Sequence, residues 1–475
     1  MIRWSGAALL AVAIACNWNV AAAETDPVRT EAADPLPALR VLDGVTTRQW
    51  SVPETGFLFG LSQQATVASY RAPAEAGDIR GQTVLGYFLS AGTGGPRDDA
   101  EAARWLRLAA DRGNAFAQAY LGNLHAVGAG VARSDTEAVR LYRLAADQGS
   151  GFGQWSLAHA YEKGLGVSQN YGEAVRLYRL AAVQGSANAQ VDLGNLYAEG
   201  RGVDRDYAEA ARLYRLAAER GHGTAQANLG NLYAQGRGVR QDSDEALRWS
   251  RRAAVQKDPT GQANLGGFYL VGIGVDRDHA EAARWFRLAA DQENPVGEVG
   301  LGLLHVAGSG VPLDYAAAAE LFRRAANSGD RDGQANLGLL YLEGLGVVKD
   351  YGQAARLFRL AADQGSFDGE TGLGLIHERG LGVAQNHAEA ARWYQRAADQ
   401  GYANAQVRLG ILHKEGLGVA RDPARAIALY REAAAGGNPE AHFRIGICLV
   451  AGMQCGARDP VEGRRLIGLA AEQGY

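Results

Sequence analysis

The sequence has little of three things: cysteine, charge of one sign and long apolar runs. Its 475 residues include three cysteines, and its 48 basic and 52 acidic residues are interleaved for a formal net charge of −4. No part therefore has the basic stripe of a nucleic-acid-binding protein. The one long apolar run, from Trp4 to Cys16, is shorter than the about 20 residues that span a bilayer. We expect no nucleic-acid partner, and no transmembrane segment after this run is cleaved off.

What the sequence has instead is an internal repeat of 36 residues. The block ANAQVDLGNLYAEGRGVDRDYAEAARLYRLAAERGH, from Ala187 to His222, is followed at once by GTAQANLGNLYAQGRGVRQDSDEALRWSRRAAVQKD. Eleven such blocks run from Ile79 to Tyr475, and only the last gains a residue, near its inter-helix turn. A fixed period of this size is typical of a solenoid, in which each unit buries its apolar face against its neighbours.

Each block contains two amphipathic helices, because its apolar residues recur at spacings of three and four. In the Ala187 block these residues are Ala189, Leu193, Leu196 and Tyr197, then Ala210, Leu213, Tyr214, Ala217 and Ala218. Glycines in the EGRGV turn and at Gly221 suit helix C-termini, and Asp206 suits a helix N-terminus. The predicted fold is all-α: a right-handed α-solenoid of about eleven helix-turn-helix repeats.

Ten of the eleven first helices carry a glycine at one interior position, where the third repeat has Ala158. Glycine in a helix interior costs about 1 kcal/mol relative to alanine, so its retention indicates a close approach between packed helix backbones. The ten residues are Gly86, Gly122, Gly194, Gly230, Gly266, Gly302, Gly338, Gly374, Gly410 and Gly446.

The pairing of AxLG, the GxGV turn and the AA-x-x-G ending resembles the Sel1-like repeat family, relatives of the tetratricopeptide repeats. The resemblance covers Ile79 to Tyr475. It implies antiparallel helix pairs whose first helices line a concave surface that binds other proteins. Enzymatic activity has been attributed to cysteine-rich members with paired cysteines in nearly every repeat, whereas this chain has two cysteines in one repeat. We therefore expect a protein or peptide partner, no enzymatic activity and no cofactor.

Residues 1–23 have the pattern of a cleaved secretory signal peptide: Arg3, then the apolar run, then small residues up to Ala23. A lipoprotein signal is the alternative, since AIAC resembles a lipobox and Cys16 would then carry the lipid. We favour the soluble form, because Ala13 stands where leucine is more usual. The predicted location is the periplasm or the cell exterior.

Between the signal and the repeats we expect two segments. Residues 24–56 contain proline and alanine and read as a flexible tether. Residues 57–78 resemble the second half of a repeat, although Pro73 would break the usual pattern. We interpret them as a capping half-repeat, because a terminal unit must cover the apolar face that has no neighbour.

Cys448 and Cys455 flank the last inter-helix turn. An even pair in an exported chain favours a disulfide, which would pin the last unit. Two buried free thiols are the alternative.

The sequence offers no candidate catalytic or metal-binding site. The histidines of one helix position replace a repeated tyrosine and have no second ligand at a metal-binding spacing, so we interpret them as core or rim residues. Ser309 has no nucleophile-elbow context. Arginines of the second helices follow glutamates by three residues, as on a solvated outer face. The four histidines are His125, His305, His377 and His413.

Amides at two positions of the first helices are the candidate partner-binding residues. Asparagine is a poor choice within a helix unless its amide is used. Repeated on a concave wall, such amides could hold the backbone of an extended peptide. The alternative is that they bond to neighbouring helices and maintain the superhelical pitch. Near the C-terminus one position becomes arginine, which suits an acidic partner segment. The candidates are Asp192, Asn228, Asn264 and Asn336; Asn123, Asn195 and Asn231; and Arg408 and Arg444.

These expectations combine into a non-enzymatic interaction scaffold of the bacterial cell envelope, which binds its partner in a concave groove. The resemblance suggests regulation of a sensor kinase, organisation of exopolysaccharide secretion or support of host contact. The alternatives are a lipid-anchored subunit of a polysaccharide secretion complex and an envelope hydrolase.

Overall fold

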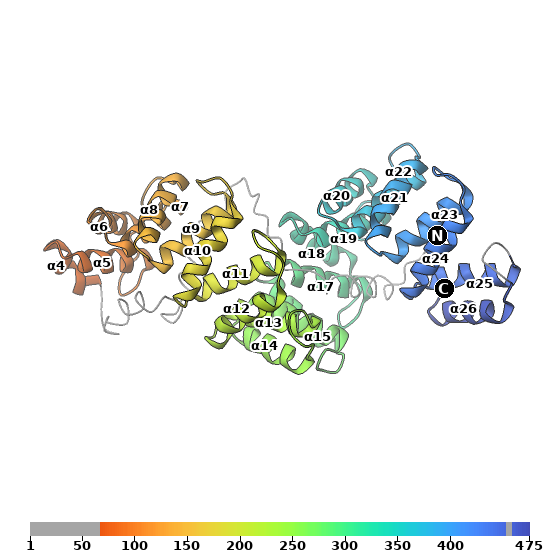
Figure 1. The fold of residues 1–475 in the computed structure, drawn as a ribbon, viewed down its shortest axis with the longest axis horizontal. Coiled ribbons are helices and arrows are strands. Elements are labelled where there is room, and N and C mark those ends of the chain that lie inside the picture. Colours follow the sequence, from red (N-terminus) through yellow and green to blue (C-terminus); the bar gives the residue numbers. More distant parts are fainter. Residues whose placement is uncertain (1–66, 453–457) are drawn as a thin grey trace.

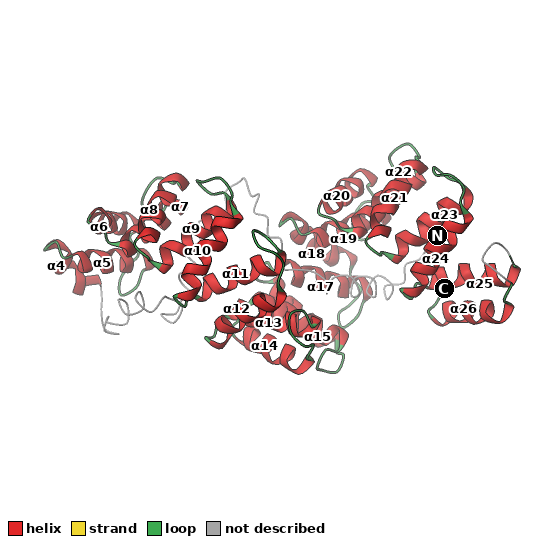
Figure 2. Cartoon of the chain, in the orientation of Figure 1, coloured by secondary structure: helices red, strands yellow, loops and turns green. Residues whose placement is uncertain are grey.

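The computed structural model describes residues 67–452 and 458–475, and every regular element in these ranges is an α-helix (Figures 1 and 2). The helices alternate between a first and a second helix of each repeat, after one preceding helix, α4 (Val67–Glu75). The first helices are α5 (Ile79–Ala91), α7 (Ala115–Val127), α9 (Gly151–Lys163), α11 (Ala187–Glu199), α13 (Gly223–Gln235), α15 (Pro259–Val271), α17 (Pro295–Ala307), α19 (Arg331–Glu343), α21 (Phe367–Arg379), α23 (Ala403–Glu415) and α25 (Pro439–Ala451). The second helices are α6 (Asp99–Asp111), α8 (Asp135–Asp147), α10 (Tyr171–Val183), α12 (Tyr207–Glu219), α14 (Ser243–Val255), α16 (His279–Ala290), α18 (Tyr315–Asn327), α20 (Tyr351–Asp363), α22 (His387–Asp399), α24 (Pro423–Ala435) and α26 (Pro460–Glu472).

The repeats follow one another along an elongated, winding solenoid (Figure 1). Beyond the contacts between consecutive helices, first helices of neighbouring repeats also contact one another, as α7 does with α9 and α15 with α17. The first helices therefore lie on the inner side of the curvature, where neighbouring units are closest. The predicted all-α solenoid is confirmed.

The glycines of the turn have two different tasks. Gly128 ends α7 in the left-handed conformation, with a φ of 74°, and its N–H donates to Leu124. Gly130 also has a positive φ, and a Cβ there would overlap the backbone of Asp99 in the preceding repeat. The first glycine thus terminates a helix, and the second lets two repeats touch through their main chains.

The interior glycines of the first helices face the second helix of the same repeat. A Cβ on Gly122 would lie 2.6 Å from the ring of Tyr142, and one on Gly302 would lie 2.6 Å from the ring of Phe322. The expected close approach is present, but at most of these positions the neighbour is an aromatic ring. The glycine leaves the depression into which that ring packs.

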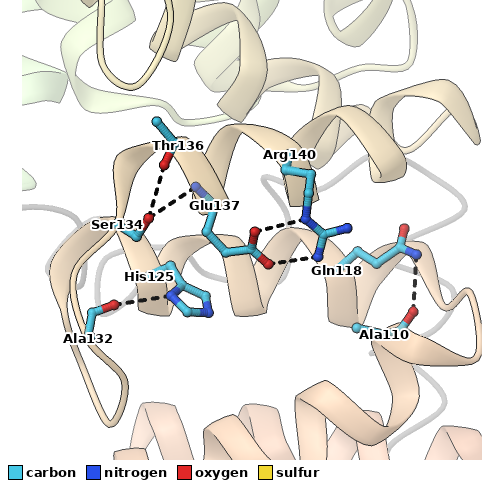
Figure 3. Close-up of polar contacts among 8 residues, drawn as sticks. All are labelled: Ala110, Gln118, His125, Ala132, Ser134, Thr136, Glu137 and Arg140. Carbon is cyan, nitrogen blue, oxygen red and sulfur yellow. Dashed lines mark hydrogen bonds and ion pairs between the residues drawn. The ribbon is translucent and has the colours of Figure 1, made fainter.

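In eight of the eleven repeats the first turn of the first helix carries a buried glutamine, which can connect the repeat to its neighbours. The Gln118 Nε2 donates to the carbonyl of Ala110 in the preceding repeat at 3.2 Å (Figure 3). Its Oε1 accepts from Gln148 Nε2, at the end of its own repeat's second helix, at 2.7 Å. In two repeats a glutamate replaces this glutamine and pairs with an arginine: Glu298 with Arg324, and Glu370 with Arg396.

The helix α4 stands where a preceding second helix would be. It packs against α5, and the carbonyl of its Ala74 accepts a hydrogen bond from Gln82 Nε2. Arg71 forms a two-pronged ion pair with Glu101 of α6, with its shorter distance at 2.7 Å. The helix continues through Pro73.

Several predictions concern residues outside the described ranges. These are the signal peptide (1–23), the tether (24–56), the first ten residues of the half-repeat, and the side chains of Cys16 and Cys455. Within the described residues, every helix is too short or too polar to cross a bilayer.

Candidate partner-binding face

Two rows of side chains run along the first helices, one residue per repeat in each. We name them the Asp192 row and the Asn195 row after their members in α11. The Asp192 row consists of Val84, Tyr120, Ser156, Asp192, Asn228, Asn264, Gly300, Asn336, Gly372, Arg408 and Arg444. The Asn195 row consists of Tyr87, Asn123, His159, Asn195, Asn231, Gly267, Leu303, Leu339, Leu375, Ile411 and Ile447.

In the Asn195 row, two amides accept hydrogen bonds from tyrosines of the second helix in the same repeat. The Tyr142 hydroxyl donates to Asn123 Oδ1 at 2.6 Å, and the Tyr214 hydroxyl donates to Asn195 Oδ1 at 2.7 Å. Asn195 Oδ1 also accepts from Asn228 Nδ2 at 3.3 Å, which links the two rows. These oxygens are therefore used inside the protein.

Asp192 is held by an aromatic donor of the preceding repeat. The Trp155 indole N–H donates to its Oδ2 at 2.7 Å. Burial, together with the nearby charge of Glu162, raises the pKa of Asp192 to about 7 despite this hydrogen bond. Glu162 is itself paired with Lys163 at 2.9 Å and accepts from the Tyr178 hydroxyl at 2.7 Å. The site between the third and fourth repeats is thus a polar cluster that includes the indole N–H of Trp155.

Besides Asn228, the Asp192 row has two asparagines, and both bond to main-chain carbonyls. Asn264 Nδ2 donates to Ala227 of the preceding repeat at 2.9 Å, and Asn336 Nδ2 donates to Asp332 of its own helix at 2.8 Å. Asn264 is buried. Asn264 thus joins neighbouring first helices, as the alternative for these residues expects, and capture of a partner by the amides stays a prediction.

The two arginines of the Asp192 row differ in their surroundings. Arg444 forms an ion pair with Glu440 at 2.6 Å. Arg408 is partly exposed and, within the described residues, has no carboxylate at ion-pair distance. Only Arg408 therefore offers an unpaired guanidinium to a partner.

The histidines that replace the repeated tyrosine belong to the turns. His125 Nδ1 lies 3.1 Å from the carbonyl oxygen of Ala132, and His305 Nδ1 lies 3.1 Å from that of Pro312 (Figure 3 shows the first pair). The Nδ1 atoms of His377 and His413 are buried without a partner. No group of three or more potential metal ligands gathers anywhere in the described ranges. The interpretation of these histidines as core or rim residues agrees with these positions.

The outer arginines form the pairs that the spacing indicates. Arg140 binds Glu137 at 2.7 Å on the exposed side of α8 (Figure 3). A second arginine of α8, α10 and α12 reaches the next repeat, as Arg179 does when it donates to the Tyr197 hydroxyl at 2.6 Å. These guanidinium groups are therefore occupied in surface ion pairs or in contacts between neighbouring repeats. We call such a contact region between two repeats a joint.

Cys448 lies near the end of α25 and is disulfide-bonded. Because Cys455 lies outside the described residues, its pairing with Cys448 stays a prediction.

The sequence interpretation missed a largely buried cluster of aromatic rings in the first three repeats. Phe116 stacks on Tyr120 with ring centroids 4.4 Å apart, and Tyr120 contacts Phe152 at 5.2 Å. Phe152 in turn stacks on Trp155 at 5.9 Å. Aligning the blocks would have shown these rings, because they occupy positions that are polar or small in the middle repeats.

A family model described as "Sel1 repeat" matches the chain eleven times in succession. The matched segments are residues 79–114, 115–150, 151–186, 187–222, 223–258, 259–294, 295–330, 331–366, 368–402, 403–438 and 439–475. These boundaries agree with the block boundaries read from the sequence, apart from one residue at the start of the ninth. No curated protein matches the chain.

Solved structures show the same similarity. The chain is 33% identical to c5321, described as a protective antigen of uropathogenic Escherichia coli with an SLR fold. That match covers 86% of this chain and 87% of the other, with a TM-score of 0.54. A Sel1 repeat protein from Oxalobacter formigenes is 28% identical over 52% of this chain and 96% of its own, with a TM-score of 0.45.

Proposed function

Because the chain belongs to the Sel1 repeat family, we propose that it is a non-enzymatic scaffold that holds a partner protein or peptide on its inner face. Solenoids of this kind present an extended surface and commonly serve protein–protein interaction. In this proposal the partner lies along the partly exposed members of the Asp192 and Asn195 rows.

One observation carries the proposal: within a single chain, the joints repeat while the inner rows change. The glutamine of the joint recurs with the same hydrogen bond at Gln118, Gln190 and Gln226. The Asn195 row, by contrast, passes from aromatic through amide to aliphatic residues. Since the repeat accepts aromatic, amide and aliphatic residues in this row, the helical hairpin does not require one residue type there. Recognition of a partner that differs along its length gives a reason for the change.

We place this scaffold in the bacterial cell envelope. Residues 1–23 have the charge and apolar pattern of a cleaved signal peptide, which supports export. The similar Escherichia coli protein is described as a protective antigen, and protection requires a protein that the immune system can reach. Within the envelope, the scaffold would regulate signalling or exopolysaccharide production by bringing partners together.

Crosslinking in living cells tests the scaffold function. The tagged full chain is crosslinked, purified from the envelope fraction and compared with a double variant, Asn195→Asp with Asn231→Asp. Asn327→Asp, on the exposed end of α18, is the matched control. We expect one set of envelope proteins to be captured by the wild type and the control and to be reduced at least fivefold in the double variant. Equal capture by all three would place the binding surface elsewhere.

The mass of the mature N-terminus tests export and separates the soluble form from the anchored one. We expect a chain that begins at Glu24, because cleavage after Ala23 follows the small-residue end of the signal. A chain that begins at a lipid-modified Cys16 would instead support the lipid-anchored secretion subunit. An intact Met1 would exclude both forms of export.

A further inference from the structure

Each residue of the Asn195 row has a counterpart 19 positions later, on the second helix of its own repeat. Where that residue is a tyrosine that reaches the row, the row has an amide: Asn123 with Tyr142, and Asn195 with Tyr214. Where it is a phenylalanine, the row has glycine or leucine. Those pairs are Gly267 with Phe286, Leu303 with Phe322 and Leu339 with Phe358. Leu375 and Ile411 are followed 19 positions later by Tyr394 and Tyr430, so a tyrosine at this position does not by itself bring an amide into the row. Among the described tyrosines, only Tyr142 and Tyr214 donate to an amide of the row.

In these two pairs the amide oxygen faces the phenol. Tyr142 and Tyr214 are buried, which raises the pKa of each phenol and keeps it a donor. Their O–H groups point at Asn Oδ1, so each carboxamide presents its NH₂ group away from the second helix. Within the described residues, the Nδ2 atoms of Asn123 and Asn195 have no acceptor of their own. Two hydrogen-bond donors per amide are thus left for a partner.

A third tyrosine shows that this arrangement is specific to the amides. In the repeat where His159 replaces the asparagine, the Tyr178 hydroxyl donates to Glu162 at 2.7 Å. Tyr178 is as buried as Tyr214 but orients no amide of the row. It is therefore the natural control.

From Leu303 onward the Asn195 row is aliphatic without interruption. Leu303 is 5% exposed and belongs to the core. The part of the row that a partner can contact consists of the partly exposed Leu339, Leu375 and Ile411 and of Ile447, which is 42% exposed. Arg408 lies beside this part of the row and has no carboxylate partner in the described residues. An apolar row with an unpaired cation complements a segment that carries aliphatic side chains next to a carboxylate.

We propose that Tyr142 and Tyr214 are positioning residues for an extended partner segment. They aim the Nδ2 donors of Asn123 and Asn195 at the main-chain carbonyls of that segment. Its aliphatic and acidic side chains then lie on the aliphatic part of the Asn195 row, beside Arg408. The inference rests on the proposed scaffold function and specifies its ligand: an extended polypeptide with a polar or neutral part and an aliphatic–acidic part. The donors hold the main chain, so they require an extended conformation more than a particular sequence. The aliphatic row supplies the sequence preference.

A peptide library tests this proposal. A random library of 24-residue peptides displayed on phage is selected on the purified full chain, and the enriched peptides are synthesised with a fluorescein label. Fluorescence anisotropy then gives their Kd for the wild type and for single variants. We expect the enriched peptides to share clustered Leu, Ile or Val residues with an adjacent Asp or Glu.

The variants separate orientation from packing. Asn195→Asp keeps an oxygen for the Tyr214 hydroxyl but removes both N–H donors, and we expect Kd to rise about tenfold. Tyr214→Phe frees the amide to turn, and we expect a rise of about fivefold. Ile447→Asn changes an exposed side chain and raises Kd by about tenfold for the aliphatic–acidic peptides. Tyr178→Phe and Asn327→Asp leave Kd within twofold of the wild type.

Each outcome decides the matter. If Tyr214→Phe and Tyr178→Phe raise Kd equally, the tyrosines act only through packing and the proposal is wrong. If Asn195→Asp binds the peptides as tightly as the wild type, the N–H groups of Asn195 do not contribute to binding and the proposal is wrong. If no peptide is enriched while crosslinking in cells still captures a partner, the scaffold function stands and this ligand is excluded. If both experiments fail, the scaffold function falls as well.

Discussion

At the scale of single residues, the interior glycines show how a small side chain fixes a helix pair. A Cβ on Gly302 would lie 2.6 Å from the ring of Phe322, closer than real atoms approach. The ring packs directly on the helix backbone, so the position has no room for a side chain. The helix tolerates the poor propensity of glycine because the ring contact outweighs it.

Substitution of this glycine gives the first prediction. Gly302→Ala gains about 1 kcal/mol of helix propensity but forces the Phe322 ring to move, which costs about 1–3 kcal/mol. We expect the melting temperature of the full chain, followed by circular dichroism, to fall. Gly468→Ala is the control, because Gly468 lies within α26 with nothing within 4 Å of its Cβ position. The melting temperature of this control should equal or exceed that of the wild type. A fall of the same size in both variants would show that the Phe322 ring is not the cause.

Two residues adopt a backbone conformation that their neighbours in other repeats reserve for glycine. Lys257 has a φ of 63° and Glu293 a φ of 59°, where equivalent positions have Gly221 and Gly329. The left-handed region costs a residue with a Cβ about 1–2 kcal/mol.

We therefore expect Lys257→Gly to stabilise its joint by about 0.5–1 kcal/mol, after the greater freedom of glycine in the unfolded chain is subtracted. Amide hydrogen exchange in α14 and α15 measures this locally. Lys349→Gly is the matched control, because Lys349 lies in a turn and does not have a positive φ. It should not slow amide hydrogen exchange in the adjacent helices. Faster amide exchange in α14 and α15 of Lys257→Gly would show that the left-handed backbone of Lys257 does not destabilise the protein.

Sequence reasoning located the amides but not their orientation. The 36-residue comparison places Asn123 and Asn195 on one row because helical spacing is regular. Whether the oxygen or the nitrogen of each amide faces a partner depends on Tyr142 and Tyr214, which lie 19 residues away on a different helix. That contact follows from how the two helices cross, and a periodicity along one helix contains no such information.

At the scale of the helices, the joints involve one buried polar side chain in the first turn of the first helix in ten of the eleven repeats. In α17 this side chain is Glu298, which is 2% exposed and pairs with Arg324 at 2.8 Å. Burial raises the pKa of Glu298 to about 7, against the opposing effect of Arg324 and with smaller contributions from Glu293 and Asp330. The folded state therefore binds a proton more readily than the unfolded state does.

The sign of the pH effect follows. A carboxyl whose pKa is raised on folding favours the folded state when protonated, so its contribution is complete below pH 4 and is lost as the pH rises towards 7. Glu298→Gln supplies the side chain that most other joints have. We expect the difference in melting temperature between variant and wild type to shift in favour of the variant as the pH rises from 5 to 8. Because both proteins keep Asp192, Asp332 and Asp368, whose pKa values are also raised by burial, the difference isolates Glu298. A pH-independent difference would contradict this.

Most of the helix boundaries could be predicted, because each has a local cause. Gly128 and its equivalents end the first helices, and Asp206 caps α12 by accepting from the N–H groups of Ala208 and Glu209. The joints could not be predicted in the same way. Gln118 was one polar residue among many until the structure placed it between Ala110 and Gln148.

At the scale of the whole molecule, the solenoid is a series of similar units, each in contact with its neighbours. Stability is then close to a sum of unit and joint contributions. Asp258 and Asn294 are equivalent residues, each of which caps the following first helix and precedes a proline. The chain can therefore be cut and rejoined at these points without a change in local structure.

Deletion of residues 259–294 tests this independence. We expect the shortened chain to fold, with helical content reduced in proportion and a melting temperature within about 5 °C of the wild type. Deletion of residues 277–294 removes half a unit and should unfold the neighbouring repeats. The whole-unit deletion should nevertheless lose affinity for the selected peptides, because the amide and aliphatic parts of the inner face are brought one unit closer together. Unfolding by both deletions would contradict independent units.

The second glycine of each turn brings the main chains of adjacent units together, and the same Gly–Gln pair of contacts recurs from one unit to the next. A coding region built this way can gain or lose one copy through unequal recombination and still yield a protein that folds. The inner face can therefore become longer or shorter by one repeat in a single step. Point substitutions can afterwards adjust the residues of the new repeat.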